Sequence, residues 1–468
     1  MDLVRAGARR RVARRRARRR AGGGGGAHRR AAAGAGPGAV RALGHDGAGP
    51  GRPGPERAIL AALRRPRQRR WEVEESLEEL AGLARAAGAE VVERVIQERG
   101  APTPAFYFGR GKIEELGALA RATGADLLVS DDPLTPVQER NISRALGIKV
   151  IDRTALILDI FAQRARTNEG KLQVELAQLT YLLPRLVGRW THLERLGGGI
   201  GTRGPGETQL ESDRRVIRRR LRQIQAELEH VRVHRRVQRE GRRRHGLPVV
   251  ALVGYTNAGK TTLLNRLTGA QLPAADRLFV TLDPAARLVH GGGRQPFILT
   301  DTVGFIRKLP HELVAAFRAT LEELTEADVL VHVVDASHPS REAHIAAVER
   351  LLDQLGVADR PCVLALNKVD RAGAEDLRAV EALAEARGGV LISAATGEGL
   401  EQLRAAVEAA LRRRVALLRL RIPHGDGTAL ALCYERGRVL SRADADAHVE
   451  LEVTLPVALE GAVEAYRV

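Results

Sequence analysis

Residues 249–268 read VVALVGYTNAGKTTLLNRLT, and this stretch decides the fold. An apolar run precedes the pattern Gly254-x4-Gly259-Lys260-Thr261, and a helix-like pattern follows it. The spacing predicts a phosphate-binding loop between a strand and a helix, because glycines let successive backbone N–H groups face an anion. We expect Lys260 to neutralise the β- and γ-phosphates and the Thr261 hydroxyl to bind Mg²⁺. The predicted fold class is therefore α/β, with a P-loop GTPase domain.

Two further segments select guanine as the base. Asn367-Lys368-Val369-Asp370 follows the strand-like run 362–366. A carboxylate at Asp370 can accept hydrogen bonds from the N1–H and the exocyclic amine of guanine, and adenine has no such donors. Ser393-Ala394-Ala395 follows another apolar run and fits the loop that closes over the base.

The fourth segment, Asp301-Thr302-Val303-Gly304, carries the response to the γ-phosphate. Asp301 is expected to hold Mg²⁺ through water, and the Gly304 N–H to sense the γ-phosphate. All four segments occur in a fixed order, each at the end of a strand-like run. Together they predict binding of GTP or GDP with Mg²⁺.

Hydrolysis depends on the two switch segments. In the loop 276–284, Thr281 is the candidate to close over Mg²⁺ and the γ-phosphate. Many GTPases place a glutamine after the Gly304 position to orient the attacking water, but this chain has Phe305 and Ile306. We therefore expect slow intrinsic hydrolysis that a partner completes. The alternative is that another part of the chain takes over the role of the glutamine.

The site residues predicted from these motifs form three groups. The nucleotide-binding residues are Gly254, Tyr255, Thr256, Asn257, Ala258, Gly259, Lys260, Thr261, Thr262, Asp301, Thr302, Val303, Gly304, Asn367, Lys368, Asp370, Ser393, Ala394 and Ala395. The hydrolytic residues are Lys260, Thr281 and Gly304, and the metal ligands are Thr261, Thr281 and Asp301. Asn257 occupies a position at which related GTPases can coordinate K⁺; alternatively, it only braces the loop.

Charge and composition point to a polyanionic partner. The 468 residues carry a net charge of +18, and residues 1–70 hold 20 arginines against three acidic residues. Residues 214–244 hold 13 arginines against three glutamates, which favours contact with RNA. The alternative is that the N-terminal arm only reflects a GC-rich genome. Cys362 and Cys433 lie in apolar runs and are expected in the core of a protein from a reducing compartment. No membrane-spanning stretch or signal peptide is evident, so a cytoplasmic location is expected.

Shifts in composition predict five segments. They are a disordered Arg/Gly/Ala-rich arm (1–56), an α/β domain (57–153), a helical hairpin with a glycine-rich tip (154–247), the GTPase domain (248–414) and a small α+β domain (415–468). In the α/β domain we expect helices at 76–87, 112–123 and 135–146 and strands at 90–97, 125–130 and 149–152.

The remaining expected elements are helical stretches at 156–193 and 207–239, with Pro184 kinking or interrupting the first, an antiparallel pair at 286–290 and 295–300, and strands at 418–422, 429–433, 438–440 and 448–455.

Beyond the GTPase motifs, the chain resembles the HflX family of translation-factor-related GTPases from about Arg57 to its end. The segments that carry the resemblance are PTPAFYFGRGKIEEL (102–116), DDPLTPVQERNI (131–142), DRTALILDIFAQRARTNEGKLQVELAQLTYLLPRL (152–186) and GGGIGTRGPGETQLE (197–211). The resemblance implies a GTPase that binds the large (50S) ribosomal subunit, with the glycine-rich tip, including Arg203, probing ribosomal RNA.

The role implied by the resemblance is splitting or rescue of stalled ribosomes under stress, or late maturation of the large subunit. An alternative is a GTP-regulated RNA-binding assembly or silencing scaffold that splits nothing. A third hypothesis, an ATP-driven module in the N-terminal domain, is disfavoured because the chain has no second phosphate loop. We expect a monomer, located in the cytoplasm, with peripheral membrane association through ribosomes as an alternative.

Overall fold

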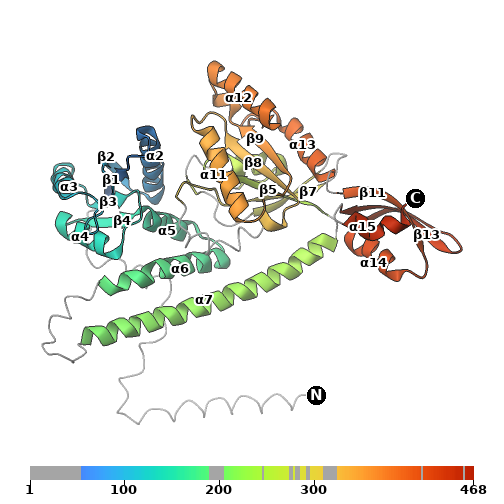
Figure 1. The fold of residues 1–468 in the computed structure, drawn as a ribbon, viewed down its shortest axis with the longest axis horizontal. Helices are drawn as coiled ribbons and strands as arrows, with labels where there is room; N and C mark the ends of the chain where they lie inside the picture. Colours follow the sequence, from blue (N-terminus) through green and yellow to red (C-terminus); the bar gives the residue numbers. More distant parts are fainter. Residues whose placement is uncertain are drawn as a thin grey trace, which may run out of the picture. The chain divides into compact units, whose positions relative to one another are not determined.

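The computed structural model describes residues 54–188, 205–244, 247–272, 278–279, 285–290, 296–308, 324–412, 415–456 and 459–468. All of them belong to the unit Pro53–Val468. They form three sheets with their helices (Figure 1), and the predicted α/β class is confirmed.

The first sheet has four parallel strands in the order β2-β1-β3-β4. The strands are β1 (Arg57–Arg64), β2 (Glu90–Glu98), β3 (Leu127–Ser130) and β4 (Lys149–Asp152). The helices that follow them in turn are α2 (Arg70–Ala87), α3 (Arg110–Thr123), α4 (Pro136–Leu146) and α5 (Arg153–Arg164). The predicted alternation of strands and helices around a parallel sheet is therefore confirmed.

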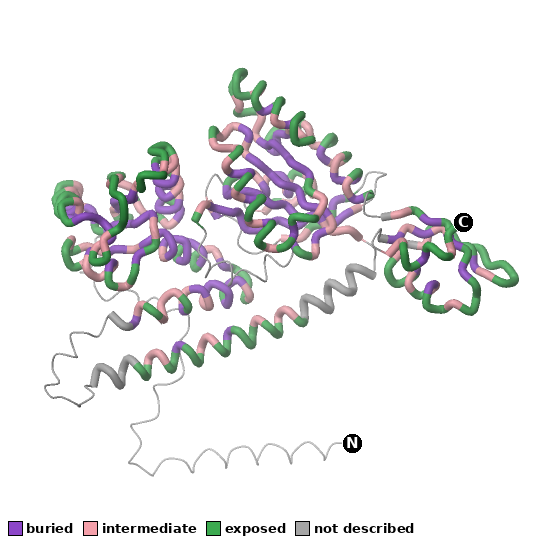
Figure 2. Tube along the Cα trace, viewed as in Figure 1, coloured by how far each residue is buried: buried purple, intermediate pink, exposed green. Residues whose placement is uncertain are grey.

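Strand β1 is the element of this sheet that the sequence did not predict. Its apolar residues 58–63 are all buried, whereas β2 has no buried residue; Figure 2 colours the trace by burial. Leu60 packs in the core under α2 and α5, whereas Ile59 packs in the core under α3. A strand covered on both faces has no alternation of apolar and polar residues, so the usual strand signal is missing.

The predicted helix 156–193 is wrong, because the structure has two helices there. α5 ends at Arg164, and α6 (Asn168–Leu182) begins after Thr167, whose hydroxyl accepts a hydrogen bond from the Gly170 N–H at 2.9 Å. This N-cap stabilises a new helix start. A 3₁₀ helix, η1 (Leu183–Gly188), contains Pro184.

Helix α7 (Pro205–Arg244) is the long helix of the second predicted helical stretch. It lies beside α6, and the Arg220 guanidinium donates two hydrogen bonds to Glu175, at 2.7 and 2.8 Å. The predicted tip, 197–206, lies mostly outside the described residues. No helix in the described parts of the chain is long and apolar enough to cross a membrane.

The second sheet has six strands in the order β10-β9-β8-β5-β7-β6. They are β5 (Val249–Gly254), β6 (Ala285–Val289), β7 (Phe297–Asp301), β8 (Val329–Asp335), β9 (Cys362–Asn367) and β10 (Val390–Leu391). Its helices are α8 (Lys260–Thr268), α11 (Arg341–Gln354), α12 (Ala374–Arg387) and α13 (Leu400–Arg412), with the 3₁₀ helix η3 (Val369–Arg371). All neighbours are parallel except β6, which pairs antiparallel with β7 as predicted. The carboxyl ends of the parallel strands lie at one edge, where ligands bind in such sheets.

The third sheet is antiparallel, in the order β11-β13-β12. Its elements are β11 (Val415–Pro423), α14 (Gly427–Arg436), β12 (Arg438–Asp444), β13 (His448–Pro456), α15 (Glu460–Val463) and the 3₁₀ helix η5 (Glu464–Tyr466). The predicted strand 429–433 is wrong, because this segment lies in α14. Asp426 caps that helix by accepting from the Ala429 N–H at 3.0 Å, and Ala429 and Cys433, four residues apart, are both buried.

The two cysteines differ in their surroundings. Cys433 is fully buried, as expected. Cys362 is exposed, which corrects the prediction that it lies in the core. It is the first residue of β9, where the strand begins to pair with β8.

Candidate nucleotide-binding site

The phosphate loop connects β5 to α8 and requires glycine at both ends. A Cβ atom on Gly254 would lie 2.2 Å from the carbonyl oxygen of Val333, and one on Gly259 would lie 2.3 Å from Nδ2 of Asn367. Both glycines also have positive φ angles, 150° and 93°. Only glycine combines these conformations with such close approach, which brings the loop backbone against β8 and β9.

Lys260 is the first residue of α8 and is buried. Its Nζ atom donates hydrogen bonds to the carbonyl oxygens of Gly254, at 3.0 Å, and Tyr255, at 2.9 Å. Burial lowers the pKa of Lys260 to about 8, and the Asp301 carboxylate partly offsets that effect. The Lys260 side chain thus folds back against the phosphate loop, and its ammonium group is held by the loop backbone.

A hydroxyl and a carboxylate meet at the ends of α8 and β7. Thr261 Oγ1 donates to Asp301 Oδ2 at 2.7 Å, and Asp301 is fully buried. Alcohol and carboxylate oxygens are the kind of ligand that Mg²⁺ takes in phosphate-binding sites. The donor set therefore fits Mg²⁺. The third predicted ligand, Thr281, lies outside the described residues.

The segment after β7 runs beside the phosphate loop. The Phe305 N–H donates to Gly254 O at 3.1 Å, and the Thr256 N–H donates to Phe305 O at 2.7 Å. The Phe305 side chain is buried with Ala251, Val253 and Leu324. It faces the apolar core and is chemically unable to orient a water molecule.

The guanine-selecting segments are joined by Asn367. Its Nδ2 donates to the carbonyl oxygen of Ala258 at 2.8 Å, and its Oδ1 accepts from the Ala394 N–H at 2.9 Å. One amide thus ties the phosphate loop to the loop after β10. Asp370, on η3, is exposed, so its carboxylate is accessible to a ligand.

Two further contacts shape the same end of the sheet. Lys368 has a φ angle of 67°, and its ammonium lies 2.6 Å from Asp335 Oδ2. Ser393 is fully buried, and its hydroxyl accepts from the Thr396 N–H at 3.1 Å. These contacts fix the two loops between which a base would lie.

All predicted site residues except Thr281 lie in the described parts of the chain. They lie at or just after the carboxyl ends of four strands, β5, β7, β9 and β10. The arrangement can cradle a triphosphate in backbone N–H groups, counter its charge and present a carboxylate to the base.

The sequence analysis missed a set of polar contacts made by the residues around Phe305. The Tyr255 hydroxyl accepts from the Arg307 N–H at 2.7 Å and donates to Glu79, whose two oxygens both lie at 3.0 Å. Lys308 Nζ pairs with Asp131 at 2.5 Å and Asp132 at 2.7 Å. No sequence signal marks these contacts, because the partners are far apart in the chain: 52 positions for Tyr255 and Arg307, and 176 for Tyr255 and Glu79.

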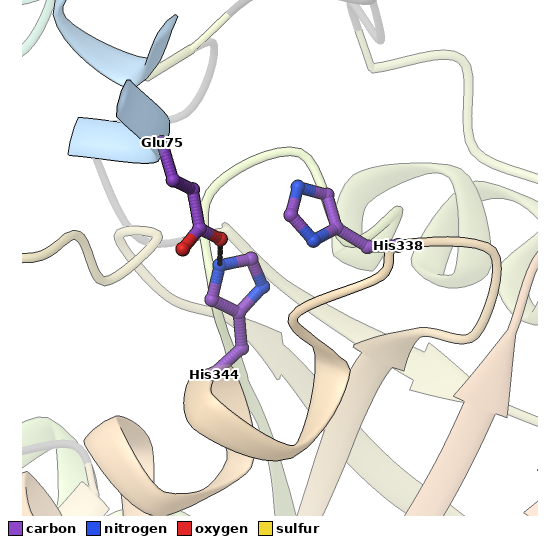
Figure 3. A group of neighbouring side chains, drawn as sticks. All are labelled: Glu75, His338 and His344. Carbon is purple, nitrogen blue, oxygen red and sulfur yellow. Dashed lines mark ion pairs between the residues drawn. The ribbon is translucent and has the colours of Figure 1, made fainter. Parts of the chain in front are cut away.

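Glu75, His338 and His344 form a separate cluster (Figure 3). Their candidate ligand atoms lie within 4.8 Å of one another, but two contacts argue against a metal site. Arg307 Nη1 lies 2.7 Å from Glu75 Oε2, which brings a cation to the carboxylate. The Ser340 N–H donates to His338 Nδ1 at 3.1 Å, whereas a metal-bound histidine usually donates its second ring N–H.

The cluster instead packs against the phosphate loop. The His344 ring stacks on Tyr255, with 3.9 Å between ring centroids and 7° between the planes. Burial lowers the pKa of His344 to about 3, so the ring is neutral at physiological pH. Its 3.8 Å contact with Glu75 is therefore not a charged pair there.

Comparison with family models divides the chain into three matched regions. Residues 74–162 match the GTP-binding GTPase N-terminal family, 164–242 the GTP-binding GTPase middle region, and 249–368 the 50S ribosome-binding GTPase family.

Curated relatives match most of the chain. The GTPase HflX of Caldanaerobacter subterraneus is 48% identical over 386 residues, which cover 82% of this chain and 87% of the relative. The GTPase HflX of Escherichia coli is 46% identical over 384 residues, covering 82% and 90%. Among solved structures, a GTP-binding protein from Sulfolobus solfataricus in complex with GDP is 26% identical, with 76% of this chain and 99% of that chain covered. The TM-score of this comparison is 0.41.

Proposed function

The chain belongs to the HflX family of GTPases, and from that premise we propose that its GTPase cycle acts on ribosomes through the large (50S) subunit. The chain binds guanine nucleotide and hydrolyses GTP, as its family does. The proposed action is to split or rescue stalled ribosomes, or to assist maturation of the large subunit. The protein would act as a cytoplasmic monomer.

The observation that carries the proposal is the burial of Phe305. A phenylalanine that packs in the core leaves the usual position of the water-orienting glutamine without a polar group. Since 249–368 match the 50S ribosome-binding GTPase family, the ribosome is the partner that would raise a slow intrinsic rate.

Six of the predicted residues have distinct roles in this proposal. Lys260 counters the charge of the β- and γ-phosphates, the Gly304 N–H faces the γ-phosphate, and Asp370 accepts hydrogen bonds from guanine. Thr261 and Asp301 would hold Mg²⁺, with Thr281 as a further ligand. The ion supplies charge neutralisation between the β- and γ-phosphates when bound.

Asn257 has a proposed role in binding K⁺. It has a left-handed backbone, with φ at 62°, between the two glycines of the loop. A cation held there would add positive charge beside the phosphates. Equal hydrolysis rates in K⁺ and Na⁺ buffers of the same ionic strength would contradict this role.

Sedimentation of ribosomes tests the ribosomal function. Intact ribosomes incubated with the protein and a non-hydrolysable GTP analogue should separate into subunits, and the Lys260→Ala variant, which lacks the phosphate-binding charge, should leave them intact. If the wild-type protein binds ribosomes in a GTP-dependent manner but never separates the subunits, the scaffold hypothesis replaces this one.

A further inference from the structure

Thr256, the third residue of the phosphate loop, has a hydroxyl with no assigned partner. The residue is 7% exposed, and its backbone N–H donates to the Phe305 carbonyl. Its Oγ1 atom is buried and has no hydrogen-bond partner among the residues that the structure describes. A buried hydroxyl without a partner is unfavourable, so such a group calls for an explanation.

The hydroxyls of Thr261 and Thr302 are both hydrogen-bonded. Thr261 Oγ1 donates to Asp301 at 2.7 Å, and Thr302 Oγ1 donates to the carbonyl oxygen of Leu252 at 2.7 Å. Thr256 therefore differs from Thr261 and Thr302, whose hydroxyls make the two hydrogen bonds just given. Its hydroxyl does not serve to hold the loop or the sheet together.

The position of Thr256 relative to Gly304 and Lys260 indicates what its hydroxyl is for. A Cβ atom on Gly304 would lie 2.8 Å from both Cα and Cγ2 of Thr256 and 3.1 Å from Lys260 Nζ. The Cα atom and the methyl group of Thr256 and the Lys260 ammonium thus lie beside the Gly304 backbone, and the Thr256 hydroxyl is on the carbon that carries this methyl group. Lys260 and Gly304 are the two groups assigned to the γ-phosphate, so Thr256 lies next to the place where the γ-phosphoryl group reacts.

The position after Gly304 offers no polar side chain. Phe305, at the usual glutamine position, is 4% exposed and contributes no polar atom. A hydroxyl can donate one hydrogen bond and accept others, so a threonine here can make a polar contact that a phenylalanine cannot.

We propose that Thr256 is a catalytic residue for intrinsic GTP hydrolysis, and that its hydroxyl donates a hydrogen bond to an oxygen of the γ-phosphoryl group during transfer. The water oxygen forms a bond to the γ-phosphorus while the bond from that phosphorus to the β–γ bridging oxygen breaks. The electron pair of the broken bond stays with GDP, and a proton of the water goes to the released phosphate. Charge is spread over the γ-oxygens in the transition state, so a donor fixed beside them accelerates the reaction.

The test compares Thr256→Val, which keeps the branched shape and removes the hydroxyl, with Thr256→Ser, which keeps the hydroxyl. Intrinsic hydrolysis is measured without ribosomes, so the result does not depend on the proposed ribosomal function. We expect kcat/KM of the valine variant to fall about tenfold or more, the size expected for one hydrogen bond to a charged group. GDP affinity should stay within about twofold, because GDP has no γ-phosphate. The serine variant should retain most of the activity.

Thr300→Val is the matched control. Thr300 is buried on β7, and its hydroxyl donates to the carbonyl oxygen of Val250 at 3.3 Å, inside the sheet. Its rate should stay close to that of the wild type. The proposal is overturned if Thr256→Val hydrolyses GTP at the wild-type rate, or if the serine variant is as slow as the valine variant. It is also overturned if the GDP affinity of the valine variant falls by as large a factor as its kcat/KM, because the substitution then disturbs the structure of the phosphate loop and not the hydrolysis step.

Discussion

Asn367 connects three of the four nucleotide motifs through single hydrogen bonds to Ala258 and Ala394. The sequence predicted that the motifs lie at strand ends, because apolar runs precede them. It did not predict that one asparagine side chain would join them, since such a bond depends on the tertiary arrangement of β5, β9 and β10. The Tyr255 contacts with Glu79 and Arg307 were missed for the same reason.

The charge on Lys260 should make nucleotide binding depend on pH. Burial lowers its pKa to about 8, so the ammonium is present below that pH and is lost as the pH rises through it. A neutral amine cannot offset phosphate charge, and GDP affinity should fall about fourfold between about pH 7 and about pH 8.5. Fluorescence titration with labelled GDP at constant ionic strength measures this. Constant affinity across the range would contradict the lowered pKa.

Phe305→Gln should not restore a water-orienting glutamine. The side chain at this position packs with Ala251 and Val253, so the new amide would be buried among apolar groups. We expect the free energy of unfolding to fall by about 3 kcal/mol, with no rise in intrinsic hydrolysis. Urea denaturation and a GTPase assay check both parts, and Phe305→Leu, with a smaller loss of stability, is the control. A faster, fully stable glutamine variant would show that the position faces the nucleotide.

At the scale of helices and strands, the sequence predicted well those elements that have a clear hydrophobic periodicity or a clear N-capping residue. The errors have physical causes. β1 is covered on both faces, so its sequence has no alternation of apolar and polar residues. α14 contains apolar residues that would also suit a strand. The break between α5 and α6 depends on the Thr167 cap, which the long apolar pattern masked. α5 packs Leu156, Ile157 and Phe161 into the core of the first sheet.

Arg153, at the start of α5, ties this helix to β3 and α2. Its side chain is 2% exposed, Nη2 donates to Asp131 at 2.7 Å and to Ser76 O at 2.8 Å, and Nη1 lies 3.6 Å from Glu79. Burial alone would lower the pKa of Arg153, but the two carboxylates more than offset it and raise the pKa above the ordinary value.

Arg153→Met should therefore destabilise the protein strongly. Removing the guanidinium takes away the buried cation that pairs with Asp131 and Glu79, and losing one partner of a buried ion pair costs about 3–5 kcal/mol in the free energy of unfolding. Arg70→Met is the control, because Arg70 forms an exposed pair with Glu74 and its loss should leave the free energy of unfolding nearly unchanged. Urea denaturation followed by circular dichroism compares them. Similar midpoints for the two variants would mean that the buried pair contributes nothing.

At the scale of the whole molecule, each sheet packs on a buried core, and the core under the first sheet also takes in Phe279, Val303 and Ile306; the family assignment covers most of the chain. The five-part division drawn from the sequence stays a prediction, as does the RNA contact of the arginine-rich helix α7. The sequence shows that this helix is rich in arginine, and charge alone favours a polyanionic partner without selecting one.

The proposed ribosomal function depends on whether a ribosome completes the site that Phe305 leaves without a glutamine. The most direct measurement is steady-state GTP hydrolysis by the purified protein, alone and with purified large ribosomal subunits, with the Lys260→Ala variant as the inactive control. We predict a rise in kcat of about tenfold or more when the subunits are present. An unchanged rate, with nucleotide bound and the subunits associated, would contradict the account.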